Sequence, residues 1–105
     1  MGKVFYRHVA RQDLILHYVY LSENANEATA ERFLSSAEES CNELALHPKI
    51  GAEVMLRQPQ LEGLRKWRVD GFEKFLIFYL PHREGVSIVR VLHVAQNWWK
   101  LLDIV

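Results

Sequence analysis

The clearest hydrophobic pattern in the chain lies between residues 27 and 46. Apolar side chains recur there every three or four positions, which aligns them along one stripe of a helix: Ala30, Phe33, Leu34, Ala37, Cys41, Leu44 and Ala45. Asn26 precedes the stripe, and its side-chain oxygen can accept a free N–H of the first turn. His47-Pro48 ends it, because the residue before a proline is disfavoured in the helical region. The pattern predicts a long helix with one buried face.

A second helical pattern comes earlier in the chain. From Arg11 to Leu21, apolar residues again recur at helical spacing. The polar stretch 22–26 predicts a turn, and two helices joined this closely form an antiparallel hairpin. Before them, the short aromatic and β-branched segment Val4-Phe5-Tyr6 predicts a strand.

The second half of the chain shows the patterns of strands. Polar and apolar residues alternate over 64–69, whereas 75–80 is apolar on both faces, as expected of a central strand that is covered on both sides. Residues 86–94 are rich in valine, isoleucine and leucine and predict a third strand. Asp70-Gly71 and the stretch 81–85 predict the turns between these strands.

The end of the chain predicts a last helix, capped by Asn97. Its apolar residues follow the i, i+3, i+4, i+7 pattern: Trp98, Leu101, Leu102 and Val105. Residues 49–63 show little periodicity and predict a loop. The complete order β-α-α-β-β-β-α predicts one α+β domain over residues 1–105, in which a helical hairpin packs on a small, mainly antiparallel, twisted sheet.

Composition indicates a soluble domain without a cofactor. Half of the 105 residues are hydrophobic, but the longest apolar run, 75–80, is far shorter than the roughly 20 residues that span a bilayer. The single cysteine, Cys41, excludes an internal disulfide and fits a cytoplasmic location. The five histidines lack the spacing of a metal site, and no glycine-rich phosphate motif is present. We therefore expect no membrane segment, no metal and no cofactor.

Charge is balanced over the whole chain but not within it. Residues 1–46 carry four basic and seven acidic side chains, whereas residues 47–100 carry nine basic and five acidic ones. Cations fall on two of the predicted strands: Arg65, Lys66, Arg68 and Lys74 on the first and its turn, Arg90 and His93 on the third. If these strands are neighbours, the cations form one basic patch on an open sheet face, which suits phosphate or an acidic protein surface. The alternative is an ordinary solvated face.

Some of these residues are of the types that cut RNA. Metal-free cleavage needs a base, an acid and a cation beside the phosphate. Tyr79, Arg90 and His93 could supply these groups, provided that the fold brings them together. The alternative is that Tyr79 is a core residue.

Two adjacent tryptophans are a further candidate for recognition. Neighbouring residues on a helix point about 100° apart, so Trp98 and Trp99 cannot face the same core. Trp98 belongs to the apolar stripe. Trp99 is then either partly exposed, as at many interface hot spots, or packed under the first strand or the 49–63 loop.

Nearly the whole chain resembles the ParE branch of the RelE/ParE toxins of type II toxin–antitoxin modules. The resemblance rests on the order of the elements and on four stretches: 44–51 (LALHPKIG), 64–72 (LRKWRVDGF), 75–79 (FLIFY) and 89–93 (VRVLH). It implies a bacterial cytoplasmic toxin that is neutralised by a small antitoxin encoded beside it. In this family, ParE-like members are associated with inhibition of DNA gyrase, whereas RelE-like members cut mRNA in the ribosome.

Two positions depart from the family patterns. The middle-strand catalytic arginine of RelE-type nucleases falls near Leu76. The arginine that they carry after the last strand falls at about Gln96, where many ParE-like sequences also have arginine. Without these two cations, the phosphate stabilisation needed for cleavage is missing, which argues against the nuclease branch. His93 keeps that branch open.

Three functional hypotheses follow from the resemblance. The first is a non-enzymatic ParE-like toxin that inhibits DNA gyrase through a surface formed by Arg90, His93, Trp99 and Lys100. The second is a ribosome-dependent endoribonuclease that uses Arg68, Arg90 and His93. The third is an inactive homologue that only binds an antitoxin.

An antitoxin is the partner expected under all three hypotheses. It would be ParD-like or another small DNA-binding antitoxin, held in a toxin–antitoxin hetero-oligomer. We expect it to contact two charged groups of residues: Glu31, Glu38 and Glu39 on the long helix, and Arg65, Lys66 and Arg68 on the first strand of the sheet.

Overall fold

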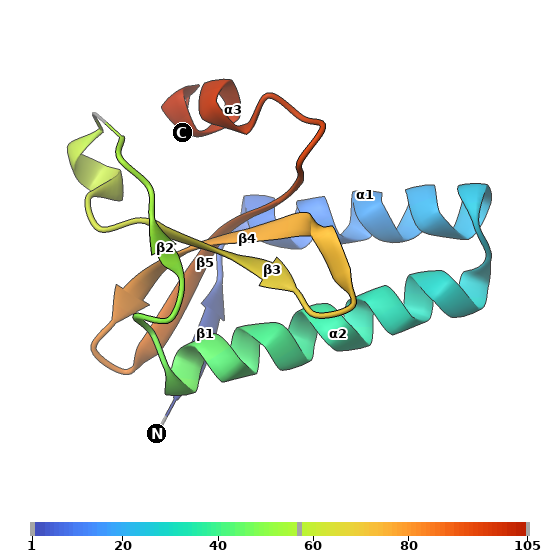
Figure 1. Ribbon diagram of the computed structural model, residues 1–105, viewed down its shortest axis with the longest axis horizontal. Coiled ribbons are helices and arrows are strands. Elements are labelled where there is room, and N and C mark those ends of the chain that lie inside the picture. The colour runs from blue at the N-terminus through green and yellow to red at the C-terminus, as the bar shows by residue number, and fades with distance from the viewer. Residues whose placement is uncertain (1, 57, 105) are drawn as a thin grey trace.

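Five strands form one mixed sheet in the computed structural model, which describes residues 2–56 and 58–104 (Figure 1). The side chains of Trp99, Asp103 and Ile104 are not described. The strands run in the order β1 (Lys3–Tyr6), β5 (Gly85–His93), β4 (Phe72–His82), β3 (Arg65–Val69) and β2 (Ala52–Glu53). Strand β1 is parallel to β5, and the other pairs are antiparallel. The predicted α+β fold is confirmed, with 75–80 inside the central strand β4.

The helical hairpin consists of α1 (His8–Asn24) and α2 (Glu27–Leu46). Asn26 caps α2 as predicted, because its Oδ1 accepts the N–H of Thr29 at 2.7 Å. The turn predicted over 22–26 is shorter than expected, since α1 continues to Asn24 and only residues 25 and 26 join the two helices. The hydroxyl of Ser22 and the amide of Asn24 donate to backbone carbonyls of the preceding turn, at Val19 and Tyr20. These bonds let polar side chains extend the helix instead of ending it.

The apolar stripe of α2 packs on one face of the sheet. Its residues are buried, except for Leu34, which is 37% exposed. Phe33 and Leu44 meet Ile77 of β4 and other strand residues in one hydrophobic cluster. Cys41 lies in the same cluster, and its burial raises the pKa of the thiol to about 11. The cysteine therefore stays protonated and acts as a packing residue.

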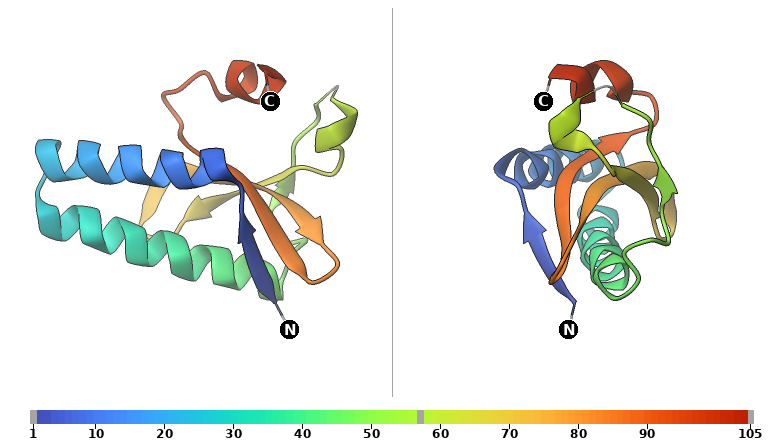
Figure 2. Two further views of the ribbon diagram at one scale, coloured as in Figure 1. Left: turned by 180° about the vertical axis from the view of Figure 1, so that it is seen from behind. Right: turned by 90° about the vertical axis from the view of Figure 1, so that its left-hand side faces the viewer.

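The opposite face of the sheet carries a second core. The helix α3 (Trp98–Ile104) and the short 3-10 helix η1 (Pro59–Leu61) lie over this face, away from α2 (Figure 2). Their buried partners on the strands include Phe78, Val89 and Leu92. The expected open sheet face is therefore wrong here, because α3 and η1 cover it. Sequence periodicity did not reveal η1, nor the edge strand β2, in the irregular 49–63 region.

Tyr79 fixes the loop that leaves α2. Its hydroxyl donates to the carbonyl of Pro48 at 2.7 Å and accepts the N–H of Gly51 at 2.9 Å. A Cβ atom at Gly51 would lie 2.6 Å from this hydroxyl, so only glycine fits there. Arg65 donates to the carbonyls of Lys49 and Gly51 at 3.1 and 2.6 Å. Burial raises the pKa of Tyr79, which keeps the hydroxyl protonated and able to donate.

We predict that Tyr79→Phe lowers the free energy of unfolding by about 1–3 kcal/mol, because the substitution leaves a buried N–H and a carbonyl without their partner. Urea unfolding followed by circular dichroism measures this change. Tyr18→Phe is the matched control, since the Tyr18 hydroxyl makes no hydrogen bond within the described residues. Equal losses in the two variants would contradict the proposed role of Tyr79.

Candidate interaction site where α1 meets the edge of β5

Helix α1 completes the edge of β5 where β1 ends. Strand β1 pairs with β5 only as far as Tyr6 opposite Ile88. Beyond that point, the carboxylate of Asp13 accepts the N–H of Val91 at 3.0 Å. His17 Nε2 lies 2.7 Å from the carbonyl of the same residue. Because residues four apart share one face of a helix, Asp13 and His17 together satisfy both backbone groups of Val91.

Asp13 also holds Arg90 in a two-pronged ion pair. The Arg90 Nε and Nη2 atoms donate to the two carboxylate oxygens at 2.7 and 2.9 Å. The Asp13 side chain is only 7% exposed and the Arg90 side chain only 13%, so water weakens the attraction little. Arg90 is therefore part of the internal structure and not a free cation, contrary to the expectation that it helps to form an exposed target surface.

The imidazole of His17 is neutral and has a defined tautomer. Its ring lies edge-on to Phe33 and Phe75, with centroids 5.9 and 4.9 Å away. This burial lowers the pKa of His17 below its usual 6.5. Because the carbonyl of Val91 can only accept, Nε2 must carry the proton. The lone pair of Nδ1 is left as an acceptor.

A cavity of about 380 Å³ opens beside His17. It lies between α1, the start of β4 and the end of β5, and is lined by Asp13, Leu16, His17, Tyr20, Phe75, His93, Ala95 and Gln96. Gln96 accepts the backbone N–H of His93 at 2.7 Å, and the Nδ1 of His93 accepts the N–H of Ala95 at 3.0 Å. Gln96 thus stabilises the turn after β5.

Sequence reasoning singled out His93 and Gln96 but missed Asp13, His17 and Tyr20. Nothing in the local pattern links residue 13 to residues 90 and 91. The one available signal was a carboxylate in the middle of an apolar helix, because a buried carboxylate needs a partner of opposite charge.

The predicted single basic patch is wrong. Strand β4 separates β3 from β5, so the cations of these two strands are not neighbours. Arg65 is bound to backbone carbonyls and to Glu53. Lys66 lies over the Trp98 ring at 5.1 Å, and Arg68 lies over the Trp67 ring at 4.6 Å. Lys74 is exposed on β4.

The nuclease candidates do not converge either. Arg68 pairs across the strands with Leu76, whereas His93 pairs with Phe75. Directly paired residues share a face and successive residues alternate, so Arg68 and His93 point to opposite sides of the sheet. The hydroxyl of Tyr79 is already engaged by the loop after α2. Within residues 2–56 and 58–104, no group of three or more metal-ligating side chains is found.

The other expected binding residues lie on separate surfaces. Glu31, Glu38 and Glu39 are all exposed on α2. Glu31 and Glu39 line a shallow hollow near the turn between β3 and β4. Lys100 is exposed on α3, whereas the side chain of Trp99 lies outside the described part of the structure.

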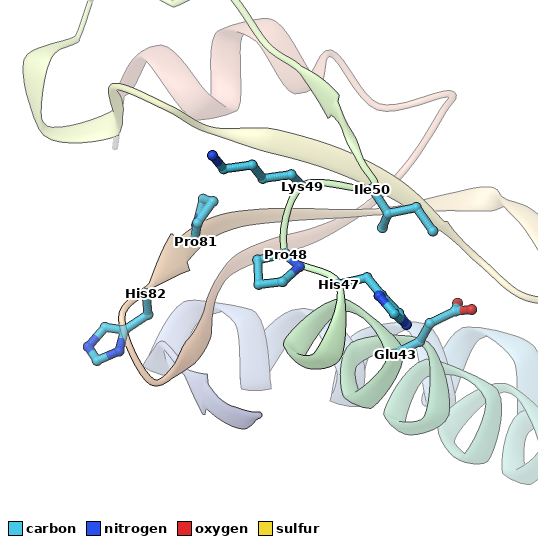
Figure 3. A pocket seen from close by; sticks show the side chains of 7 residues that line it. All are labelled: Glu43, His47, Pro48, Lys49, Ile50, Pro81 and His82. Atoms are coloured by element: carbon cyan, nitrogen blue, oxygen red, sulfur yellow. The ribbon is translucent and has the colours of Figure 1, made fainter. Parts of the chain in front are cut away.

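A larger hollow of about 840 Å³ lies between the end of α2 and the β4–β5 hairpin (Figure 3). Its lining is largely apolar, with Pro48 and Pro81 close to its centre. The polar side chains do not converge: Lys49 and Glu43 extend in opposite directions, and His82 points outward (Figure 3). This surface therefore lacks the concentrated polar groups that the cavity beside His17 has.

Comparison with known proteins identifies relatives of this chain. A family model described as ParE toxin of type II toxin-antitoxin system, parDE, matches residues 4–98. Among solved structures, the chain is similar to one from the chromosomal ParDE TA system from P. aeruginosa, at 17% identity and a TM-score of 0.70. The similarity covers 89% of this chain and 96% of that chain, and at this identity it shows the fold. A search of curated proteins found no match. None of the helices in the described residues has the length and hydrophobicity to span a membrane.

We predict that Asp13→Asn lowers the free energy of unfolding by about 3–5 kcal/mol, because it leaves the Arg90 guanidinium buried without a counter-charge. Urea unfolding measures this loss. Glu84→Gln is the control, since it breaks the exposed pair between Lys3 and Glu84, and we expect a change within about 0.5 kcal/mol. A small effect of Asp13→Asn would show that the ion pair does not hold α1 on β5.

We also predict that stability falls as the pH drops from 7 through 6.5. The unfolded chain takes up a proton on His17 near pH 6.5, whereas the folded protein resists it because its His17 pKa is lower. The contribution of His17 to folding stability is thus fully present above pH 6.5. It is lost as the pH falls toward the lower His17 pKa of the folded state. Thermal unfolding between pH 7 and 5 should show a weaker pH dependence for His17→Gln than for the wild type. The exposed His8→Gln variant should follow the wild type; if His17→Gln does so too, the explanation fails.

Proposed function

The chain belongs to the ParE toxin family of type II toxin–antitoxin systems, and from this premise we propose that it is a non-nucleolytic toxin that inhibits DNA gyrase in the cytoplasm. The observation that carries the proposal is the family match over residues 4–98, which includes the helical hairpin, strands β2 to β5 and all of β1 but its first residue. Gyrase inhibition is the activity associated with ParE-like toxins.

The internal use of the cations supports a binding function over RNA cleavage. Arg90 is neutralised by Asp13, and Arg68 lies on the opposite side of the sheet from His93. The resemblance places the nuclease arginine near Leu76, which carries no charge. A phosphate placed beside His93 would therefore meet neither Arg90 as a free cation nor Arg68, and its transition state would lack their electrostatic stabilisation.

Membership in a toxin–antitoxin family gives the chain an antitoxin as its partner. We propose that the antitoxin covers the outer face of α1, where four large apolar side chains are exposed: Ile15 by 62%, Leu16 by 65%, Val19 by 43% and Tyr20 by 59%. Contiguous exposed apolar surface of this kind is typical of a protein interface. We refer to these four residues as the α1 apolar face.

The charged residues expected to contact the antitoxin differ in whether they already have partners within the chain. The exposed acidic side chains of Glu31, Glu38 and Glu39 remain proposed contacts for basic residues of the antitoxin. Arg65, Lys66 and Arg68 have partners within the chain, so their contacts with an antitoxin would have to compete with these. This makes them weaker candidates than the acidic face of α2.

The proposed gyrase-binding surface lies around the end of β5 and α3. It retains His93, Trp99 and Lys100 from the sequence analysis. Lys100 is exposed, and the His93 ring lines the cavity beside His17. Arg90 keeps a supporting role there, because its pairing with Asp13 positions the strand that carries His93.

We predict that the purified toxin inhibits the supercoiling of relaxed plasmid by DNA gyrase and leaves ribosome-bound mRNA uncut. His93→Ala is expected to weaken the inhibition by about tenfold, the typical effect of losing one side chain that anchors an interface. Gel electrophoresis of plasmid topoisomers measures the first effect, and primer extension on mRNA from a translation reaction measures the second.

The protein encoded next to the toxin gene provides the control. Its addition in equimolar amount should restore supercoiling, which shows that the inhibition comes from the toxin and not from a contaminant. Cleaved mRNA with normal supercoiling would overturn the proposal in favour of the nuclease, and the absence of both activities would favour an inactive homologue.

A further inference from the structure

The cavity beside His17 is continuous with the α1 apolar face but differs from it in chemistry. Leu16 and Tyr20 belong to both, so a chain lying on α1 would pass the mouth of the cavity. Its volume of about 380 Å³ is near the lower end for ligand pockets, enough for one group of ring size. A single side chain is therefore the natural unit of binding.

The cavity favours a neutral occupant. Both oxygens of Asp13 already accept hydrogen bonds from Arg90, and one also accepts from Val91. The carboxylate thus has little left to offer a cation. An anion finds no free positive charge either, because Arg90 is paired and the lowered pKa of His17 keeps its ring uncharged. A buried charge without a partner is costly, so charged side chains are excluded.

The walls favour an aromatic ring. The rings of His17 and His93 each lie edge-on to Phe75 with centroids 4.9 Å apart, and Tyr20 lines the same space. Aromatic rings prefer such edge-to-face arrangements, and a further ring can extend the cluster.

One hydrogen-bond acceptor among the residues that line the cavity is unused. The Nε2–H of His17 is donated to Val91, and the Nδ1 lone pair has no partner among the described residues. Nδ1 is not one of the buried polar atoms that lack a hydrogen bond, so it is accessible to solvent. The ring that carries it lines the cavity. An occupant with an N–H or O–H group can satisfy it.

We propose that this cavity binds an aromatic side chain with a polar hydrogen, an indole or a phenol, which the antitoxin presents as its anchor on α1. The identity of the partner rests on the proposed function. The ring would pack against Phe75 and donate its hydrogen to Nδ1 of His17. The α1 apolar face by itself would bind any hydrophobic side chain. The hydrogen bond to His17 would add a preference for tryptophan or tyrosine over phenylalanine or leucine.

The test uses the free toxin and two small probes. N-acetyl-L-tryptophanamide and its 1-methylindole derivative differ only by one methyl group on the indole nitrogen, so only the first has an indole N–H to donate to His17. In a titration followed by ¹H–¹⁵N NMR, we expect the first to bind with a dissociation constant on the order of millimolar and to shift signals of His17, Ala95 and Gln96. The methylated probe should bind about three- to tenfold more weakly, the value of one neutral hydrogen bond.

Two variants of neighbouring residues locate the site. Tyr20→Ala removes a wall of the cavity and should abolish the shifts, whereas Val19→Ala, on the α1 apolar face but outside the lining, should leave them unchanged. Equal binding of the two probes, no binding of either, or equal effects of the variants would overturn the proposal.

A second experiment tests whether the aromatic ring comes from the antitoxin. Prior binding of the protein encoded next to the toxin gene should displace the probe, whereas retention of the probe in the complex would show that the antitoxin does not use this cavity. Because the titration involves no gyrase, a failure here is distinct from a failure of the proposed inhibition.

Discussion

The structure depends on how the edge of β5 is completed after β1 ends. A buried strand edge with open N–H and C=O groups would cost free energy at each group. Here two side chains of α1, Asp13 and His17, take the place of the missing strand at Val91. The same carboxylate binds Arg90, so that helix, strand edge and buried cation form one unit. This unit holds α1, and with it the hairpin, against the sheet.

That arrangement also commits the cation of Arg90 to an internal ion pair. The guanidinium of Arg90 stabilises the fold and is not available to a phosphate. The outer side of α1 instead carries the α1 apolar face, with the cavity of His17 beside it. A toxin of the ParE family that acts by occupying a partner needs such surfaces more than it needs free cations. The antitoxin that we propose on the α1 apolar face would bind there without any chemical step.

Prediction from the sequence succeeded where the signal is local. The stripe of α2 and its Asn26 cap depend on residues three or four positions apart. The end of α1 was misplaced because Ser22 and Asn24, common in turns, bond back to the helix here. The short elements β2 and η1 have no periodicity of their own, since they exist by packing on β3 and on the core around Leu61.

The sequence by itself determined the types and order of the long helices and strands, because periodicity, capping and turn chemistry act between near neighbours. It also indicated the family, through the resemblance of four short stretches and of the order of the elements. Only the tertiary structure decided which charged and polar groups remain free for function. Asp13 and Arg90 are separated by 77 positions, and β4 lies between the two strands expected to share a basic patch. Whether a cation faces solvent or a buried carboxylate depends on such distant pairings, which no local pattern records.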